Sequence, residues 1–466
     1  MSDSTQAGPS EGEAPLMLGV SGMRGLVGAS LTEEVVARYA AAVGRWLVRE
    51  RAADAPLVVV GRDSRPSGEA YEDAAVRGLH AAGCRVIRVG ILSTPGVAVA
   101  LQAAGADGGL VLTASHNPAP WNGVKPLRHD GVAPPPEAVA SIIADFHEAP
   151  DPGSNEGGSN ERDAGAADRH VQAVLATLPD ADRAAVRGCA FKVVVDCVAG
   201  AGGREAALLL EALGADATLL HEEPTGDFPH DPEPIAANLT GLCEAVKERG
   251  AAVGFALDPD ADRLALVDAA GRFVGEEYTL VVGAMALLGE GGAVAANLST
   301  SRMIDRVAES RGGRVVRSPV GEANVAAAMR AAGATVGGEG NGGIIDARVS
   351  QVRDSLVGIA ATLRLMATED ATLAELIARV PSYAVVKTKR PVGGVPGGIA
   401  GFLEAAEARV TDGETEAAVD RQDGVRVDLP RGWVHVRPSN TEPVVRVIAE
   451  AGSEQEAEAL VALASG

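Results

Sequence analysis

The chain has 466 residues, a length that suggests roughly three or four domains. Its 41 Lys and Arg residues against 63 Asp and Glu residues give a formal net charge of -22, which argues against a nucleic-acid-binding surface. Four cysteines, scattered without metal-ligand spacing, indicate neither a disulfide framework nor a zinc site. With no basic leader and no long apolar run, we expect a cytoplasmic protein without a membrane segment.

Short Val, Leu and Ile runs alternate with Ala-rich amphipathic stretches, a pattern typical of α/β domains. After a disordered tail at 1–15, we predict a first α/β domain over 16–150. Its expected strands are at 57–60, 85–89 and 109–112, and a helix is expected at 67–82. The segment 151–167 is rich in Pro, Gly, Ser, Asn and Glu, which predicts a flexible linker.

Two more α/β domains are predicted, followed by a different pattern. The domain at 168–272 contains expected strands at 191–195 and 252–257, and the domain at 273–384 contains expected strands at 293–297, 314–317 and 334–337. The last segment, 385–466, predicts a smaller α+β domain with an antiparallel sheet. Its expected elements are a helix at 399–410, paired strands at 424–429 and 433–437, and a final helix.

Three aspartates alternate immediately after the strand expected at 252–257. Carboxylates at the spacing of Asp258, Asp260 and Asp262 can converge on a hard cation such as Mg²⁺ from a single loop. Arg263 beside them can neutralise a phosphate. An acidic turn without a ligand is the alternative, and an EF-hand is excluded because its glycine and distal glutamate are missing.

Ser115 lies in the segment Thr-Ala-Ser-His-Asn-Pro (113–118), on a tight turn after a strand. Its hydroxyl is expected to face solvent or a cleft, with His116 and Lys125 as candidates for proton transfer. A turn or cap serine is the alternative. No Gly-x-Ser-x-Gly elbow is present, so serine-hydrolase chemistry is unsupported.

The segment Arg-Pro-Ser-Asn-Thr-Glu-Pro (437–443) also follows an expected strand. Guanidinium, hydroxyl and backbone donors in such a turn can hold a phosphate dianion, and a simple polar turn is the alternative. The candidate donors are Arg437, Ser439, Asn440, Thr441 and Arg446.

The segment Gly-Glu-Gly-Asn-Gly-Gly (338–343) formally matches the dinucleotide-binding fingerprint. No helix is predicted after it, and no acidic residue ends a second strand about twenty positions on, so the match is weak. Glu339 and Asn341 are instead suited to bidentate hydrogen bonds with vicinal sugar hydroxyls. A glycine turn without a ligand is the alternative.

Together, and in this order, these four motifs resemble those of the α-D-phosphohexomutase superfamily, and the resemblance covers residues 18–464. It implies four domains around a central cleft, three α/β domains with mixed sheets and a smaller C-terminal α+β domain. The implied reaction moves a phosphoryl group between the 6- and 1-positions of a hexose phosphate. It passes through a phosphoserine and a hexose 1,6-bisphosphate, which serves as intermediate and activator.

The resemblance also implies roles for single residues. Ser115 would carry the phosphoryl group, and one Mg²⁺ per chain would be bound by this group together with Asp258, Asp260 and Asp262. The loop 437–441, with Arg446, would hold the non-reacting phosphate. The remaining catalytic residues implied are Arg24 and Arg263, which would support the phosphoserine, and His116 and Lys125, which would assist proton transfer.

Within the superfamily the motifs are most similar to those of phosphoglucosamine mutases. Conversion of glucosamine 6-phosphate to glucosamine 1-phosphate is therefore expected, with phosphomannomutase or phosphoglucomutase activity as the alternative. Better-known members carry Ser in place of Asn341 and His in place of Gly343, in the loop expected to contact the sugar. A hexose phosphate is the expected small-molecule partner, and the chain is expected to be a monomer or homodimer without a nucleic-acid or membrane partner.

Three other interpretations use parts of the same motifs. A metal-dependent sugar-phosphate phosphatase would use the same Ser, Asp and Arg residues and would release free phosphate. A non-catalytic sugar-phosphate sensor would have little use for Ser115, Lys125 and three carboxylates. A nicotinamide oxidoreductase rests on the glycine-rich segment alone, and a cofactor titration would exclude it.

Overall fold

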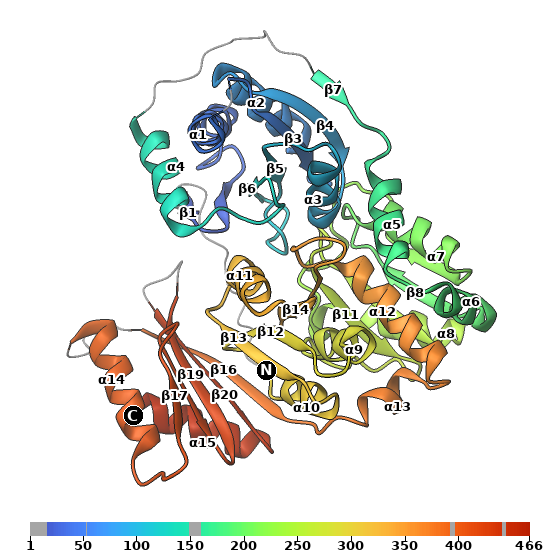
Figure 1. The fold of residues 1–466 in the computed structure, drawn as a ribbon, viewed down its shortest axis with the longest axis vertical. Coiled ribbons are helices and arrows are strands. Elements are labelled where there is room, and N and C mark those ends of the chain that lie inside the picture. The colour runs from blue at the N-terminus through green and yellow to red at the C-terminus, as the bar shows by residue number, and fades with distance from the viewer. Residues whose placement is uncertain (1–15, 53, 149–159, 392–396, 440–443) are drawn as a thin grey trace, which may run out of the picture.

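The computed structural model describes residues 16–52, 54–148, 160–391, 397–439 and 444–466. The expected tail at 1–15, most of the expected linker, and Asn440 and Thr441 lie outside these residues. The described chain forms four units, each built on one sheet (Figure 1). Three units are α/β and the last is an antiparallel sheet with helices, so the predicted fold class is confirmed.

The first unit is a seven-stranded mixed sheet in the order β1-β2-β6-β5-β3-β4-β7. Its strands are β1 (Met17–Gly19), β2 (Gly22–Leu26), β3 (Leu57–Arg62), β4 (Arg85–Ile91), β5 (Gly108–Leu112), β6 (Trp121–Arg128) and β7 (Asn160–Arg162). Its helices are α1 (Glu33–Arg51), α2 (Gly68–Ala81), α3 (Thr94–Ala103) and α4 (Pro136–Glu148). Strand β7, inside the expected linker, pairs with β4 at the sheet edge; three residues are too few for a periodic signal.

The second and third units have the same four-stranded plan, with orders β11-β10-β8-β9 and β13-β12-β14-β15. In each unit three strands are parallel, and a fourth strand pairs antiparallel with them at one edge of the sheet. The second unit comprises α5 (Ala166–Ala176), α6 (Asp180–Cys189), β8 (Lys192–Asp196), α7 (Gly203–Ala212), β9 (Asp216–Leu220), the 3-10 helix η1 (Ala236–Asn238), α8 (Thr240–Arg249), β10 (Val253–Leu257) and β11 (Leu264–Asp268). The third comprises α9 (Tyr278–Leu287), β12 (Ala293–Asn297), α10 (Met303–Ser310), β13 (Arg314–Ser318), α11 (Glu322–Ala332), β14 (Val336–Glu339), β15 (Gly343–Asp346), α12 (Ser355–Thr368) and α13 (Leu373–Ile377).

The fourth unit is a five-stranded, wholly antiparallel sheet in the order β16-β20-β19-β18-β17. It comprises β16 (Ala384–Pro391), α14 (Gly398–Thr411), β17 (Ala418–Asp420), β18 (Val425–Leu429), β19 (Gly432–Pro438), β20 (Val444–Ala451) and α15 (Glu454–Ser465). Its helices and sheet enclose a core of their own, and the unit stands apart in Figure 1.

The second and third units share a continuous apolar core. Residues of both sheets, such as Phe255 and Ile344, belong to one buried cluster, together with Leu356 and Ile359 of α12. This helix packs against α6 of the second unit and α9 of the third. The two units are therefore joined by apolar burial rather than by a linker.

Each of the four sequence motifs lies where one strand ends and the next strand of the chain, antiparallel to it, begins. The strand pairs are β5 and β6, β10 and β11, β14 and β15, and β19 and β20. The sequence predicted the strand before each motif but not the antiparallel strand after it. Strands β11 and β15 are buried along their whole length, so they lack the alternation that marks a strand with one exposed face.

Among the described residues, no helix combines the length and apolar character needed to span a bilayer. All four cysteines are free thiols.

Candidate active site

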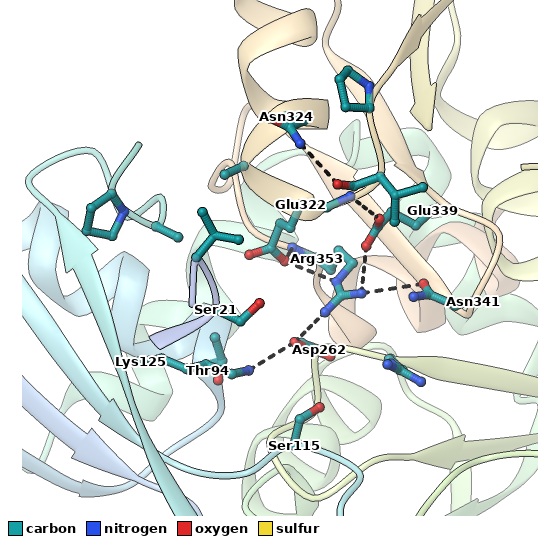
Figure 2. Close-up of a pocket in the computed structure, with 18 of the residues that line it drawn as sticks. Ser21, Thr94, Ser115, Lys125, Asp262, Glu322, Asn324, Glu339, Asn341 and Arg353 are labelled. Atoms are coloured by element: carbon teal, nitrogen blue, oxygen red, sulfur yellow. Dashed lines mark hydrogen bonds and ion pairs between the residues drawn. The ribbon is translucent and has the colours of Figure 1, made fainter. Parts of the chain in front are cut away.

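A cavity of about 480 Å³ is lined by side chains from all four units. Figure 2 labels lining residues of the first three. The first unit contributes Ser115 and Lys125, the second Asp262, the third Glu339 and the fourth Arg437. These residues are far apart in sequence, and the packing of the four units brings them together. The sequence-predicted site residues within the described part of the chain therefore lie in or beside one cavity.

Ser115 sits in the serine loop, which we define as residues 113–120 between β5 and β6. Its φ of 51° lies in the left-handed region, which a residue with a side chain adopts only when its surroundings hold it there. The hydroxyl donates a 3.0 Å hydrogen bond to Oδ2 of Asp258, and the backbone N–H donates to Thr113 Oγ1 at 2.8 Å. The nucleophile candidate is thus aimed at the acidic motif of another unit.

Arg65, which sequence reasoning missed, holds the serine loop in place. Its side chain is fully buried, and its Nε lies 3.0 Å from Asp63 Oδ2. The guanidinium donates to four carbonyl oxygens of this region, those of Ser115 (2.7 Å), Asn117 (2.6 Å), Pro118 (2.8 Å) and Trp121 (2.7 Å). The charged segment Arg-Asp-Ser-Arg (62–65) at the carboxyl end of a buried strand was the sequence signal that could have identified it.

Asp258, Asp260 and Asp262 form a tight cluster in the acidic loop, residues 258–263. Ala261, with φ 51°, turns the chain so that oxygens of all three carboxylates lie within 4.8 Å of one another. All three are buried, and Oδ1 of Asp260 and of Asp262 has no hydrogen-bond partner among the described residues. Buried carboxylate oxygens without donors fit a divalent cation, so this cluster can bind a metal.

Lys125 and Arg353 face the cluster and balance part of its charge. Lys125 Nζ lies 2.6 Å from Asp260 Oδ2 and 3.3 Å from Asp262 Oδ2. Burial alone lowers the pKa of Lys125, but the two carboxylates raise it overall. Burial alone raises the pKa of Asp262, and Arg353 and Lys125 lower it overall. Asp258 forms no ion pair with a Lys or Arg side chain of the described residues, so burial and the other two carboxylates raise its pKa.

Arg353, immediately before α12, was not predicted from the sequence. Its guanidinium bridges three carboxylates, Asp262 (2.7 Å), Glu322 (3.1 Å) and Glu339 (2.9 Å), as Figure 2 shows. A Cβ at Gly343 would lie 2.1 Å from Arg353 Cδ. The missing side chain at 343 therefore leaves the space that Arg353 occupies.

His116, Arg24 and Arg263 surround Ser115. His116 Nδ1 lies 3.4 Å from Ser115 Oγ. Burial, together with Arg263 and Arg24, lowers the pKa of His116 to about 3, so the ring is neutral at neutral pH. The Nε atoms of Arg24 and Arg263 are buried and have no hydrogen-bond partner among the described residues. These two donors are suited to an anion beside the serine.

The residues expected to bind the sugar and the non-reacting phosphate lie on the third and fourth units. Both oxygens of Glu339 accept protein hydrogen bonds, Oε1 from Asn297 at 2.7 Å and Oε2 from Arg353. Asn341 Oδ1 lies 3.4 Å from Arg353 Nη1. The glycine-rich segment is a turn between antiparallel strands, and this geometry differs from the strand–turn–helix of a dinucleotide-binding loop.

On the fourth unit, Arg437, Ser439 and Arg446 line the cavity. Arg437 and Arg446 are opposite each other in the β19–β20 register. Arg437 Nε donates to Asp423 at 2.9 Å, whereas Arg446 Nε is buried without a partner among the described residues.

Comparison with known proteins gives a match in every unit. The four domain families described as phosphoglucomutase/phosphomannomutase match at residues 15–152 (alpha/beta/alpha domain I), 185–271 (domain II), 275–383 (domain III) and 396–464 (C-terminal domain). A phosphoglucomutase/phosphomannomutase of Thermococcus kodakarensis is 37% identical over 95% of this chain and 96% of its own. A probable phosphoglucosamine mutase of Methanopyrus kandleri is 37% identical over 95% of both chains. A phosphoglucosamine mutase of Salinispora tropica is 36% identical over 94% of this chain and 95% of its own.

Solved structures agree with this result. A phosphoglucomutase/phosphomannomutase family protein of Burkholderia thailandensis superimposes with a TM-score of 0.80 at 27% identity, covering 95% of this chain and 96% of its own. A putative phosphomannomutase of Thermus thermophilus superimposes with a TM-score of 0.80 at 26% identity, covering 97% and 98%. With all four units matched and relatives above 30% identity along almost the full length, the chain belongs to the phosphoglucomutase/phosphomannomutase family, within the phosphohexomutases.

Proposed function

We propose that this protein, a phosphohexomutase, converts glucosamine 6-phosphate to glucosamine 1-phosphate. The proposal rests above all on Ser115 Oγ, which lies 3.0 Å from Asp258 beside a cavity that all four units line. The proposed domains are a phosphoserine domain (16–150), a metal-binding domain (168–272), a sugar-binding domain (273–384) and a phosphate-binding domain (385–466). A cytoplasmic location and a monomeric or homodimeric state stay predictions.

In the proposed reaction Ser115 carries the phosphoryl group. The bond between Ser115 Oγ and phosphorus breaks as O1 of the sugar bonds to phosphorus, which yields a hexose 1,6-bisphosphate. After this bisphosphate turns over in the cavity, Ser115 Oγ takes the phosphoryl group from O6 and glucosamine 1-phosphate is left. A Mg²⁺ ion held by Asp258, Asp260 and Asp262 would offset the charge of the transferring group.

The proton on the attacking hydroxyl needs an acceptor. In the second half-reaction the attacking hydroxyl is that of Ser115, and neutral His116 can take its proton because Nδ1 lies 3.4 Å from Ser115 Oγ. The ammonium group of Lys125 is suited to donate a proton to the sugar oxygen that leaves in that step. Arg24 and Arg263 would hold the equatorial oxygens through Nε donors that lack partners among the described residues.

The phosphate that does not react must be held in either orientation of the sugar. We assign this to Arg437, Ser439 and Arg446 of the fourth domain, together with Asn440 and Thr441 as predicted from the sequence. A guanidinium pair on adjacent strands offers bidentate contacts to a phosphate dianion. Because this clamp and Ser115 belong to different units, one clamp can serve both half-reactions.

The choice of sugar is supported by charge. Glucosamine phosphates carry an amino group at C2, where glucose and mannose carry a hydroxyl. On the third unit Glu322 and Glu339 line the cavity, and Arg353 is shared between these two carboxylates and Asp262. Glu322 and Glu339 thereby place two carboxylates on the cavity wall, and a carboxylate is the group with which an ammonium at C2 forms an ion pair.

A coupled assay tests the proposal. Purified protein with Mg²⁺ and a trace of hexose 1,6-bisphosphate is given glucosamine 6-phosphate, mannose 1-phosphate or glucose 1-phosphate, and isomerisation and free phosphate are both measured. We expect the highest kcat/KM with glucosamine 6-phosphate and no stoichiometric phosphate. Preference for another sugar would overturn the substrate assignment, and stoichiometric phosphate release would favour a phosphatase.

A further inference from the structure

A second cluster of possible metal ligands lies in the second unit, outside the acidic loop. Asp196 ends β8, His221 follows the neighbouring strand β9, and His230 lies in the segment 221–235, which we name the histidine loop. The Asp196 carboxylate is 3.0 Å from His221 Nδ1 and 2.9 Å from His230 Nε2. Donor atoms from all three residues lie within 4.8 Å of one another.

The orientation of His230 requires a positive charge beside the carboxylate. Its Nδ1 lies 2.8 Å from the backbone carbonyl oxygen of Asp231. A carbonyl only accepts, so Nδ1 carries the hydrogen, and in the neutral ring the lone pair of Nε2 points at Asp196 Oδ2. Two lone pairs at 2.9 Å repel each other unless a proton lies between them or both atoms ligate one metal ion from the same side.

The same arrangement occurs around metal-binding histidines. A ligating imidazole usually donates its second N–H to a carbonyl or carboxylate, which fixes the tautomer and turns the other nitrogen toward the metal. The Asp231 carbonyl performs this function for His230.

His221 is held in an unusual backbone conformation that points its ring at the same carboxylate. Its φ is 52°, in the left-handed region, and its carbonyl accepts a 3.0 Å hydrogen bond from the N–H of Ala199. Strained backbone of this kind is concentrated at ligand-binding sites. The Asp196 side chain is only 3% exposed, but that of His221 is 42% exposed, so one side of the cluster is open to solvent.

We propose that Asp196, His221 and His230 form a binding site for one divalent transition metal ion, with Zn²⁺ as the physiological ion. Two imidazoles and one carboxylate are borderline ligands that favour Zn²⁺ or Co²⁺, whereas the all-oxygen acidic loop favours Mg²⁺. The open side leaves room for water as a further ligand. None of the four cysteines takes part, which is why cysteine spacing gave no sign of this site.

The ion would fix the position of the histidine loop, which contacts residues of the active site. Within this loop Phe228 lies under the guanidinium of Arg65, whose carbon is 5.0 Å from the ring centre. Glu233 Oε1 lies 3.5 Å from Arg263 Nη1 and 3.9 Å from His116 Nε2. Arg65 in turn holds the serine loop. By fixing the histidine loop, the metal would stabilise both the Phe228–Arg65 contact and the contacts of Glu233 near Ser115.

Cobalt binding in excess Mg²⁺ tests the proposal. The Mg²⁺ occupies all-oxygen sites such as the acidic loop, and the visible absorption spectrum of bound Co²⁺ identifies the type of its ligands. The full-length protein is incubated with Co²⁺, desalted, and measured for bound metal and visible absorption. We expect about one Co²⁺ per chain with the d–d bands of nitrogen ligands, and at least a tenfold loss of affinity in His221→Asn and in His230→Gln. Asn tolerates the left-handed backbone at 221, and His129→Ala, at an exposed histidine elsewhere, serves as the matched control.

A second measurement does not depend on how the variants fold. Wild-type protein is treated with diethylpyrocarbonate with and without Zn²⁺, and the modified histidines are identified by mass spectrometry. We expect Zn²⁺ to protect His221 and His230 at least tenfold while His129 reacts equally in both samples. Equal Co²⁺ retention by the folded variants, or no protection of the two histidines, would overturn the proposal.

Discussion

Buried polar atoms without partners mark the site most clearly at the scale of single residues. Oδ1 of Asp260 and of Asp262 has no donor among the described residues, and Nε of Arg24, Arg263 and Arg446 has no acceptor there. Leaving such an atom unpaired costs about 1–3 kcal/mol. A metal ion would supply the missing partner of the carboxylate oxygens. A phosphate group would supply the missing acceptor of the guanidinium nitrogens.

Substitution of the serine tests its chemical role. Ser115→Ala keeps the Cβ at a position with φ 51° and removes the hydroxyl that donates to Asp258. We expect kcat to fall by at least about 10³-fold because no oxygen is left to carry the phosphoryl group. The coupled assay measures this, with the exposed Ser141→Ala as control. Mutase activity within tenfold of wild type would contradict the phosphoserine role.

Arg353 offers a test of a residue that the sequence did not reveal. Arg353→Lys cannot reproduce the fork that reaches Asp262, Glu322 and Glu339 together. Leaving buried carboxylates without their partner is expected to lower the free energy of unfolding by about 3 kcal/mol and kcat/KM by about tenfold or more. Thermal melting and the coupled assay check both. Arg379→Lys, whose exposed pair with Glu369 is worth little, should change neither.

At the scale of elements, a buried polar network ties helices of different units together. His170 on α5 lies between Glu205 of α7, at 2.6 Å, and Asp354 at the start of α12, at 2.8 Å. Glu205 also accepts from the N–H and hydroxyl of Ser93, which caps α3. Because Asp354 follows Arg353 directly, this network fixes the backbone from which Arg353 reaches the site.

The network predicts a pH dependence of stability. Burial alone lowers the pKa of His170, but Asp354 and Glu205 raise it to about 10 in the folded protein. The unfolded value is near 6.5, so the stabilisation is complete below that pH and is lost as pH rises toward 10. We expect His170→Gln to lower the melting temperature most at pH 6 to 7, and the difference from wild type to narrow by pH 10. A difference that stays constant over this range would show that His170 is uncharged in the fold.

At the scale of the whole molecule, the units are joined in two different ways. The second and third share an apolar core, whereas the fourth contacts the third through polar groups. Ser299 Oγ lies 2.9 Å from His435 Nδ1, and Asp423 accepts from the N–H of Val320 at 3.0 Å while it pairs with Arg437. Polar contacts of this kind separate more easily than a continuous core, so motion of the fourth unit is expected to open the cavity.

Asp423 is the residue at which this contact can be tested. Asp423→Ala removes the acceptor of the Val320 amide and the partner of Arg437. We expect the amides of residues 320–324 to exchange hydrogen at least fivefold faster in the variant, measured by mass spectrometry, with the core of the second unit unchanged. Asp420→Ala, at a carboxylate that bonds only Gln422 among the described residues, is the control. Unchanged exchange at 320–324 would show that Asp423 does not hold this contact between the units.

Much of the fold could be predicted because parallel strands and amphipathic helices leave local signals. The strands that begin at Leu57, Lys192 and Ala293 were each predicted to within two residues. Strands β11 and β15 were not, since burial on both faces removes alternation, and β7 was too short to show any.

By itself the sequence determined the domain classes, the order of the four motifs and the chemistry that each motif can supply, because these depend on residues that are close together in the chain. Only the tertiary structure decided that the motifs meet, and that each lies between two antiparallel strands. It also revealed Arg65, Arg353 and the pairing of Asp196 with two histidines. Arg353 is 91 residues from Asp262, and His230 is 34 from Asp196. Contacts over such separations follow from packing of whole units, which no local pattern encodes.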